Sequence, residues 1–182
     1  MEGISMSNIA TLTYDAATSL LYGAIPGFKS FHMFAESGGG RGRTEGAAQN
    51  DIYSHLATTR TVKTVKHNYI QRGGTLPPGD YKCTYWANHK TFKECVQLIT
   101  QENAKRIFSP FAIHAIVHCR KLDDFFIHGR GKLGSDGCIV PYNRAERLRL
   151  ARAIRDYDGD VIITVKHVGY MLPAENVNGL VT

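Results

Sequence analysis

A histidine and a cysteine in one short segment have the spacing and surroundings that nucleophilic chemistry needs. His128 ends an apolar run, and Cys138 begins the next one ten positions later. A cysteine is a nucleophile only as its thiolate, so it needs a base within reach. The residues between the two are rich in glycine and charged side chains, and such a loop can fold back until imidazole and thiol meet. The pattern predicts Cys138 as a nucleophile and His128 as its base.

The residues directly before Cys138 fit an acyl-transfer site. Gly137 leaves the backbone uncrowded, so its N–H and that of Cys138 can point at a developing oxyanion. Ser135 and Asp136 can brace the turn through bonds from side chain to backbone. Each element alone is typical of a structural residue, since a lone cysteine after glycine usually has no chemical role. Their combination favours a catalytic role over a structural one.

Turn-forming residues and alternating apolar residues around this pair predict a mainly β fold with one helix. The expected strands cover residues 11–14, 19–24, 28–34, about 81–85, 92–99, 111–119, 125–128, 137–140 and 161–168. The helix begins at Asn143, because an asparagine cap followed three residues later by Glu146 is a close variant of the capping box. We expect one domain over residues 1–182, loop-rich over 37–70 and with a flexible tail from 169.

The cysteines show none of the paired spacings of a metal site. They are Cys83, Cys95, Cys119 and Cys138. If the hairpin between the strands is centred on His89, Cys83 and Cys95 lie opposite each other. A disulfide there requires the narrower type of strand pair. Two buried thiols are the favoured interpretation in a chain without a signal peptide.

Two histidines at alternate strand positions, His114 and His118, are further candidates for a site. With no third ligand nearby they are typical of packed or hydrogen-bonded side chains rather than of a metal centre. His118 is a candidate neighbour of Cys138. The sequence predicts no metal and no cofactor.

The charge of the chain favours an acidic partner. Lys and Arg number 22 against 16 Asp and Glu, a net charge of +6, which suits nucleic acid, an anionic membrane face or a cell wall carrying carboxylates and phosphates. The one local concentration of arginines lies in the expected helix, where a solvated face is the commoner pattern. It comprises Arg144, Arg147, Arg149, Arg152 and Arg155. Nucleic-acid binding is therefore not predicted.

The sequence also bears on location. No stretch reaches the ~18 apolar residues of a spanning helix, so membrane insertion is not expected. The N-terminal residues lack the basic start and apolar run of a secretory signal. We expect the protein to be made in the cytoplasm and to leave it only by a route other than general export.

The order of these motifs resembles the signature of the YkuD-type L,D-transpeptidases. An Ile-His-Gly triplet at 127–129 is followed by Ser-Asp-Gly-Cys-Ile at 135–139 and by Asn143. In that family a His-Gly pair precedes Ser-His-Gly-Cys and a nearby Asn. Residues 74–81, Gly-Thr-Leu-Pro-Pro-Gly-Asp-Tyr, are similar to the family's turn leading into a strand. The resemblance covers about 74–165 and implies a small β-sandwich with a helix against it.

The resemblance implies a reaction and a set of roles. Cys138 would attack the bond between meso-diaminopimelate and D-Ala in a peptidoglycan tetrapeptide stem, with His128 as base. The N–H groups of Gly137 and Cys138 would form the oxyanion hole. Release to water would be carboxypeptidase action, capture by a free D-amino acid would be exchange, and capture by a second stem would be cross-linking.

Two departures separate this chain from the housekeeping enzymes. Asp136 stands where the family has a second histidine, so this position would instead fix the loop or bind a substrate ammonium. The loop between His128 and Cys138 is short, as in the L,D-transpeptidase-like toxins delivered by type VI secretion systems. That likeness implies an antibacterial role in a target cell's periplasm, with a secretion carrier and an immunity protein as partners.

Three positions are weaker candidates. Gly129 and Arg130 lie in the loop over the expected site, where Arg130 would attract a substrate carboxylate or merely be solvated. Asn143 matches the family pattern, but its role as helix cap is sufficient reason for it.

Two other functions stay open. A cysteine amidase or endopeptidase of the papain-like type would also act on the cell wall. Those enzymes place the cysteine at a helix start with the histidine after it, which is the reverse of the order here. The other alternative is a wall-binding module that kept the fold without catalysis.

Overall fold

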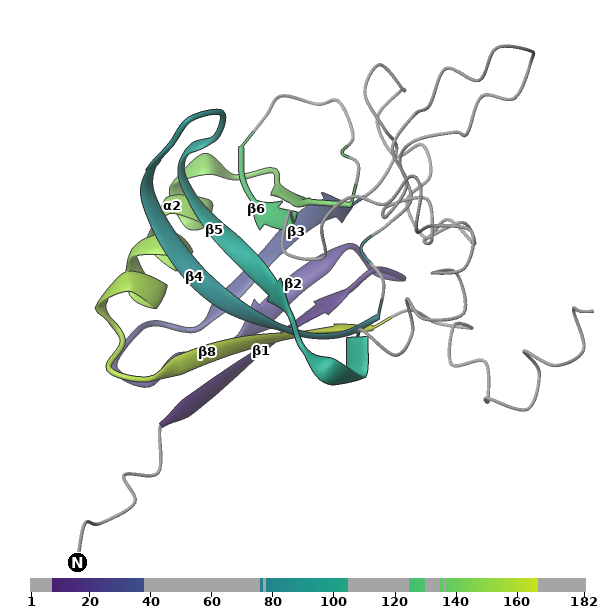
Figure 1. Cartoon of the computed structure of the whole chain (residues 1–182), viewed down its shortest axis with the longest axis horizontal. Helices are drawn as coiled ribbons and strands as arrows, with labels where there is room; N and C mark the ends of the chain where they lie inside the picture. Colours follow the sequence, from purple (N-terminus) through teal and green to yellow (C-terminus); the bar gives the residue numbers. More distant parts are fainter. Residues whose placement is uncertain are drawn as a thin grey trace, which may run out of the picture.

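The structure is a computed structural model that describes residues 8–37, 76, 78–104, 125–129, 135 and 137–166. Within them the chain forms strands and one long helix (Figure 1), which confirms the mainly β class with a helix after Cys138. In chain order the elements are β1 (Ile9–Asp15), β2 (Leu20–Gly23), β3 (Phe31–Ser37), β4 (Gly79–His89), β5 (Lys93–Thr100), β6 (Phe125–Ile127), β7 (Ile139–Pro141), α2 (Arg144–Asp156) and β8 (Asp160–Lys166).

The strands join into one sheet that closes on itself. The order around it is β1-β2-β3-β7-β6-β5-β4-β8, and β8 pairs back onto β1. The β1–β8 and β6–β7 pairs are parallel, and the other pairs are antiparallel. The two layers expected of a sandwich are thus opposite walls of one continuous sheet, in which each described strand has a neighbouring strand on both sides.

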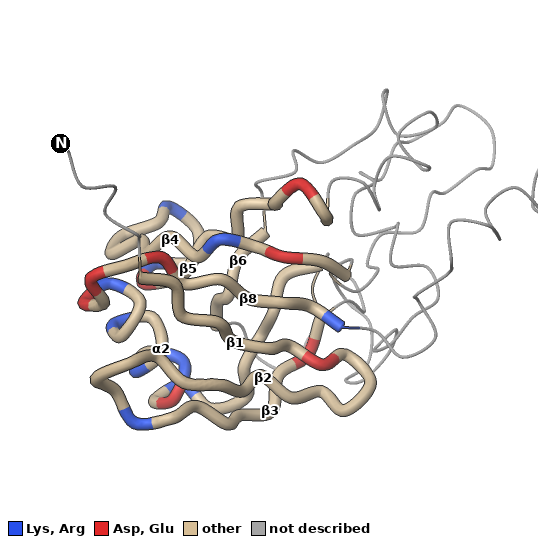
Figure 2. The backbone as a smooth tube through the Cα atoms, turned by 90° about the horizontal axis from the view of Figure 1, so that it is seen from below, with Lys and Arg blue, Asp and Glu red and all other residues tan. Residues whose placement is uncertain are grey.

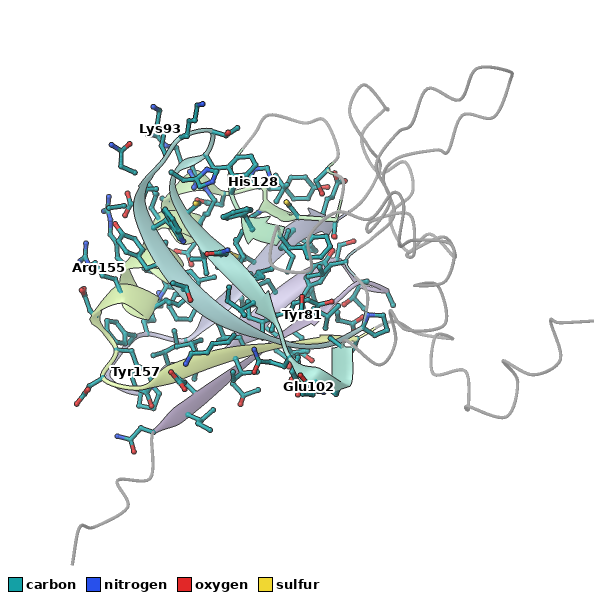
Figure 3. The ribbon with its side chains drawn as sticks, viewed as in Figure 1. Tyr81, Lys93, Glu102, His128, Arg155 and Tyr157 are labelled. Carbon is teal, nitrogen blue, oxygen red and sulfur yellow. The ribbon has the colours of Figure 1, made fainter. Side chains whose placement is uncertain are left out.

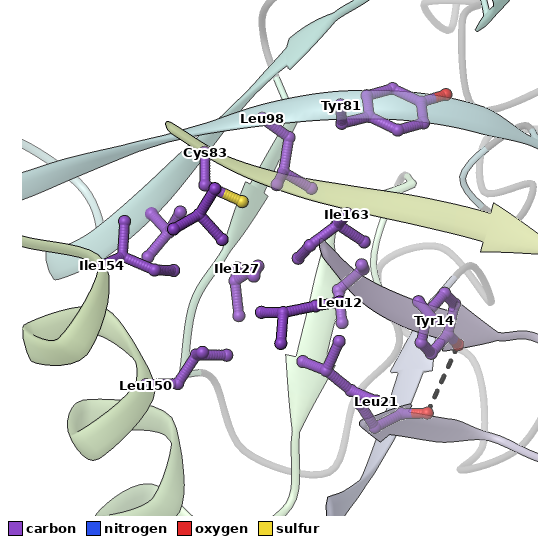
Figure 4. Packing of buried hydrophobic residues seen from close by; sticks show 14 of the residues in the cluster. Leu12, Tyr14, Leu21, Tyr81, Cys83, Leu98, Ile127, Leu150, Ile154 and Ile163 are labelled. Atoms are coloured by element: carbon purple, nitrogen blue, oxygen red, sulfur yellow. Dashed lines mark hydrogen bonds between the residues drawn. The ribbon is translucent and has the colours of Figure 1, made fainter. Parts of the chain in front are cut away.

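The core fills the inside of this closed sheet. Along β1, residues Ala10, Leu12 and Tyr14 are buried while their neighbours are exposed or half-buried, the period of two that a half-buried strand requires. Leu12, Leu21 and Ile163 come from three strands and belong to the same buried cluster (Figure 4). The hydroxyl of Tyr14 donates to the Ala35 carbonyl at 3.3 Å, which gives its polar tip a partner inside the core.

Helix α2 packs onto this core, mainly beside β4 and β5, and its Leu150 and Ile154 join the same buried cluster (Figure 4). It begins where the sequence predicted, because the Asn143 side chain accepts a hydrogen bond from the Glu146 N–H at 3.1 Å. Arginines outnumber acidic residues along it (Figure 2), and Arg152 pairs with Glu94 at 3.0 Å. The prediction of a solvated arginine face holds for exposed members such as Arg152 but is wrong for Arg147, which is buried.

The β4–β5 hairpin differs from the expectation for Cys83 and Cys95. The pairs are Cys83 with Leu98 and Trp86 with Cys95, so the two thiols are not opposite each other. Cys83 points into the main core, whereas Cys95 belongs to a separate small cluster. Both are free thiols on different faces of the sheet, and a disulfide between them is ruled out.

The cause of that difference is the side chain of His89. Its Nδ1 accepts hydrogen bonds from the N–H groups of Thr91 and Phe92, both at 3.2 Å. The turn therefore follows His89 instead of centring on it, and His89 pairs with Lys93 across an irregularity in the ladder.

Other boundaries differ by a few residues. The strand expected at 28–34 begins only at Phe31, because the Phe28 N–H bonds to the Ile25 carbonyl in a preceding turn. Ser37, expected in a loop, is the last residue of that strand. The strand expected at 111–119, the loop-rich segment after Ser37 and the tail from 169 lie outside the described residues. In the part of the chain that is described, no helix is long and apolar enough to cross a membrane.

Candidate active site

The register of β6 and β7 puts His128 and Cys138 on one face of the sheet. The parallel ladder between these strands has one residue pair, Ile127 with Ile139. It is extended by the His128 N–H, which donates to the Ile139 carbonyl at 3.1 Å. Both isoleucines point into the core. Because side chains alternate along a strand, His128 and Cys138 project from the opposite, outer face.

A small apolar cluster on this outer face surrounds the pair. Cys95, Phe126 and Cys138 form it, with Phe92 packed against them. Phe92 also stacks on the His128 imidazole, with ring centroids 3.9 Å apart and planes inclined by 11°. Figure 3 shows His128 at the same end of the molecule as the β4–β5 hairpin tip, the part of the chain that supplies Phe92. The stack fixes the plane of the imidazole and keeps water from one of its faces.

The backbone at Cys138 is held by two serine hydroxyls. Ser37 Oγ donates to the Gly137 carbonyl at 3.3 Å, and Ser135 Oγ donates to the Cys138 carbonyl at 2.5 Å. Gly137 has φ of 103°, a conformation that favours glycine. A trans peptide points its carbonyl and N–H in opposite directions, so the grip on the Gly137 carbonyl also sets the direction of the Cys138 N–H. A fixed N–H beside a thiol is what an oxyanion donor requires.

The glycine after His128 has a packing role. A Cβ on Gly129 would lie 2.8 Å from Arg147 Nη2 and 2.9 Å from its Cζ, so the guanidinium rests directly on this backbone. Nη1 of the same arginine donates to the Glu94 carbonyl at 2.9 Å. Burial, and then the charge of Arg144, lower the pKa of Arg147. Arg147 thus ties α2 to β5 and to the residue that follows the histidine.

Sequence reasoning missed Arg147 as part of this site. The only sequence signal was its place in a run of arginines, which is typical of a solvated helix face. Its burial comes from the position of α2 over β5, which the local sequence does not encode.

Replacing Gly129 with alanine is expected to lower the free energy of unfolding by about 1 kcal/mol, the lower end of the usual cost of an extra methyl group, because the methyl group meets only the end of the flexible Arg147 side chain. Urea unfolding followed by circular dichroism measures it. The same substitution in an Arg147→Ala background is the control, because the guanidinium that the methyl group meets is then gone. Equal costs in the two backgrounds would contradict the contact.

The other described thiols are unsuited to act as nucleophiles. Burial raises the pKa of Cys95 to about 11, and burial raises that of Cys83 further. Both therefore stay protonated near neutral pH. Cys95 shares the small outer cluster with Cys138, and both are free thiols.

The structure describes only one of the remaining candidate residues. Asn143 caps α2, a structural role that accounts for its presence. Arg130, Asp136 and His118 lie outside the described residues. Among the residues that are described, no group of three or more His, Cys, Asp or Glu side chains could hold a metal ion. The roles of Cys138 and His128 stay predictions that their shared position now supports.

Comparisons with known proteins give one distant likeness. No family model matches the chain, and no curated protein matches its sequence significantly. A crystal structure of the L,D-transpeptidase from Xylanimonas cellulosilytica is similar at 11% identity, with a TM-score of 0.39. The match covers 89% of this chain and 62% of that chain, so the chain spans less than two thirds of the length of its match.

Proposed function

We propose that this protein is a cysteine acyl-transfer enzyme of the L,D-transpeptidase type that acts on peptidoglycan peptide stems. The observation that carries the proposal is the placement of His128 and Cys138 on one outer face of the β6–β7 pair. The left-handed Gly137 and the hydroxyls of Ser37 and Ser135 support it, because they hold the backbone at the nucleophile.

In the proposed reaction, His128 takes the proton of the Cys138 thiol. The thiolate attacks the carbonyl carbon between diaminopimelate and D-Ala, and the Cys138 N–H stabilises the resulting oxyanion. The imidazolium then gives its proton to the amino group of D-Ala, which leaves, and a thioester remains on Cys138. Water releases the shortened stem as a carboxylic acid, or the amine of a D-amino acid forms a new amide. Either step returns the thiol.

The elements that carry the pair favour this class over a papain-like lysin. Cys138 directly precedes strand β7, and His128 directly follows strand β6, earlier in the chain. A papain-like enzyme would place its cysteine at a helix start with the histidine after it. Here the helix begins only after Asn143, beyond the nucleophile.

Purified protein incubated with tetrapeptide muropeptides gives the direct test. We expect the terminal D-Ala to be released and, when a different D-amino acid is added, to be replaced by it, as read by mass spectrometry. Cleavage of the glycan-to-peptide amide or of D-Ala cross-links would instead identify an amidase or endopeptidase. Binding to sacculi without any covalent change would identify a wall-binding module.

The biological role within this proposal is that of an antibacterial toxin. It is supported by the resemblance to type VI effectors and by the net charge of +6, which suits a wall carrying carboxylates and phosphates. The target cell's periplasm would be its place of action, with a carrier in the secreting cell and a cognate immunity protein. Expression in a Gram-negative host with and without an export signal tests this, since harm confined to the exported form is expected. Equal harm from both forms would contradict a periplasmic target.

A further inference from the structure

Glu36 on β3 is a buried carboxylate that has no basic partner in the part of the chain that the structure describes. Its side chain is 8% exposed, and the Tyr142 hydroxyl donates a hydrogen bond to its Oε1. Among the described residues no Lys, Arg or His forms an ion pair with it, although basic residues outnumber acidic ones 22 to 16 in the chain. Other acidic residues do have such partners; these are Glu94, Glu146, Asp156 and Asp160. A buried carboxylate is costly unless a cation or further donors compensate it.

The register of β3 and β7 puts Glu36 beside the nucleophile. Ser37 pairs with Ile139, and Glu36 pairs with Val140. Ile139 points into the core, so Glu36, Val140 and Cys138 project from the outer face. On that face Glu36 is a diagonal neighbour of Cys138, a relation with backbones about 7–8 Å apart.

Cys138 therefore lies between two polar side chains on neighbouring strands. Strand β7 runs between β6 and β3, so His128 flanks the cysteine on one side and Glu36 flanks it on the other. The proposed reaction uses the histidine and leaves the carboxylate without a role. A group bound by Glu36 would sit next to the bond that Cys138 attacks.

Two exposed aromatic side chains extend this edge of the site. Phe34 is 60% exposed and Tyr142 is 52% exposed. They are opposed across the β3–β7 pair, because the Tyr142 N–H donates to the Phe34 carbonyl at 3.0 Å. Aromatic faces attract cations, and the phenol oxygen of Tyr142 adds an acceptor beside the carboxylate. Carboxylate, phenol and rings together are a set of groups suited to an ammonium ion.

We propose that Glu36 and Tyr142 bind a primary ammonium group of the substrate next to Cys138. The inference rests on the proposed acyl-transfer function and adds a determinant of its specificity. The ammonium can belong to the diamino acid of the donor stem or to the amino acid acceptor. The experiment below separates these two sources.

The first arm compares Glu36→Gln with Glu146→Gln, a matched loss of a carboxylate that pairs with Arg149 on α2. Glutamine keeps the size of Glu36 and still accepts from Tyr142. Each protein is given a donor stem with the free amino group of its diamino acid and the same stem lacking it. In the wild type and in Glu146→Gln, loss of the amino group should lower kcat/KM roughly ten- to a hundredfold, the range of a hydrogen bond to a charged group. Glu36→Gln should be slow with both stems and should not distinguish them.

The second arm measures exchange against the concentration of a free D-amino acid. If the acceptor's ammonium is the bound group, Glu36→Gln should raise the half-saturating acceptor concentration roughly tenfold or more. Hydrolysis of the donor should then be unchanged.

Several outcomes overturn the inference. The carboxylate has no role if the Glu36→Gln variant still distinguishes the two stems and binds the acceptor as the wild type does. Equal slowing on every substrate, together with a lower unfolding midpoint, would show that the Glu36–Tyr142 bond only ties β3 to β7. Loss of discrimination in Asp136→Asn instead would assign the ammonium to that residue.

A binding measurement keeps this test separate from the proposed function. In a Cys138→Ala background, calorimetry with the two stems reports the ammonium contact without turnover. The Cys138→Ala protein should prefer the stem with the free amino group, and the preference should disappear in the Cys138→Ala/Glu36→Gln double variant. That result supports the subsite even if the wild type turns over no stem. If the wild type turns over stems but shows no preference for the free amino group of donor or acceptor, the ammonium subsite is wrong and the proposed function stands.

Discussion

Replacing Cys138 with alanine is expected to abolish both the release of D-Ala and its exchange, while the protein stays folded. The thiol is the only group at this position that can form the thioester, so the rate should fall by roughly a thousandfold or more. Its small side chain belongs to a minor cluster outside the main core, so the loss of packing is modest. Muropeptide mass spectrometry after extended incubation measures the rate, and thermal unfolding checks the fold.

Cys83→Ala is the matched control for this experiment. Its thiol lies on the other face of the sheet, inside the core, and burial raises its pKa so that it stays protonated. The variant should lose some stability and keep its activity. If Cys138→Ala still releases D-Ala while Cys83→Ala does not, the nucleophile has been assigned to the wrong residue.

Removal of His128 should give the second-largest loss, and one that depends on pH. Near neutral pH, His128→Ala should reduce kcat/KM by roughly a hundred- to ten-thousandfold, the range of general-base catalysis. Without its base the variant depends on ionisation of the thiol by solvent, which increases with pH, so its rate should keep rising after that of the wild type has levelled off. The ratio of wild type to variant should therefore narrow as the pH increases, as measured between about pH 6 and 10.

Free imidazole provides the control for His128→Ala. Alanine leaves a space against the Phe92 ring, on which the native imidazole is stacked. Added imidazole should therefore restore part of the activity of His128→Ala and none of that of Cys138→Ala. A variant that matched the wild type in rate and pH profile would remove His128 from the mechanism.

Much of this fold could be predicted where local rules decide it. The β1–β2 hairpin follows from the alternation over 11–14 and the turn that comes after it, and the start of α2 follows from the Asn143 cap. The placement of His128 and Cys138 at the edges of two apolar runs was also visible in the sequence. For the turn and the cap, the deciding interactions lie within a few residues along the chain.

The features that the sequence did not predict depend on contacts between distant segments or on a single side chain. His89 moved the β4–β5 turn by binding two N–H groups, and that shift changed the partner of Cys83. In a strand, a shift of register changes which residues share a face. Arg147 and Glu36 gave no local signal, since their burial depends on how α2 and β7 pack against other strands.

The ladder between β6 and β7 is one residue pair long, and this makes the spacing of His128 and Cys138 independent of the length of the loop that connects them. In a parallel pair the end of one strand and the start of the next lie at opposite ends of the ladder. Here the ladder is one pair long, so those two ends nearly coincide. Each additional ladder residue would move His128 and Cys138 about 3.3 Å further apart, whereas a longer connecting loop would leave their spacing unchanged. During evolution the loop can therefore lengthen and change substrate access. The lengths of β6 and β7 cannot change without separating His128 from Cys138.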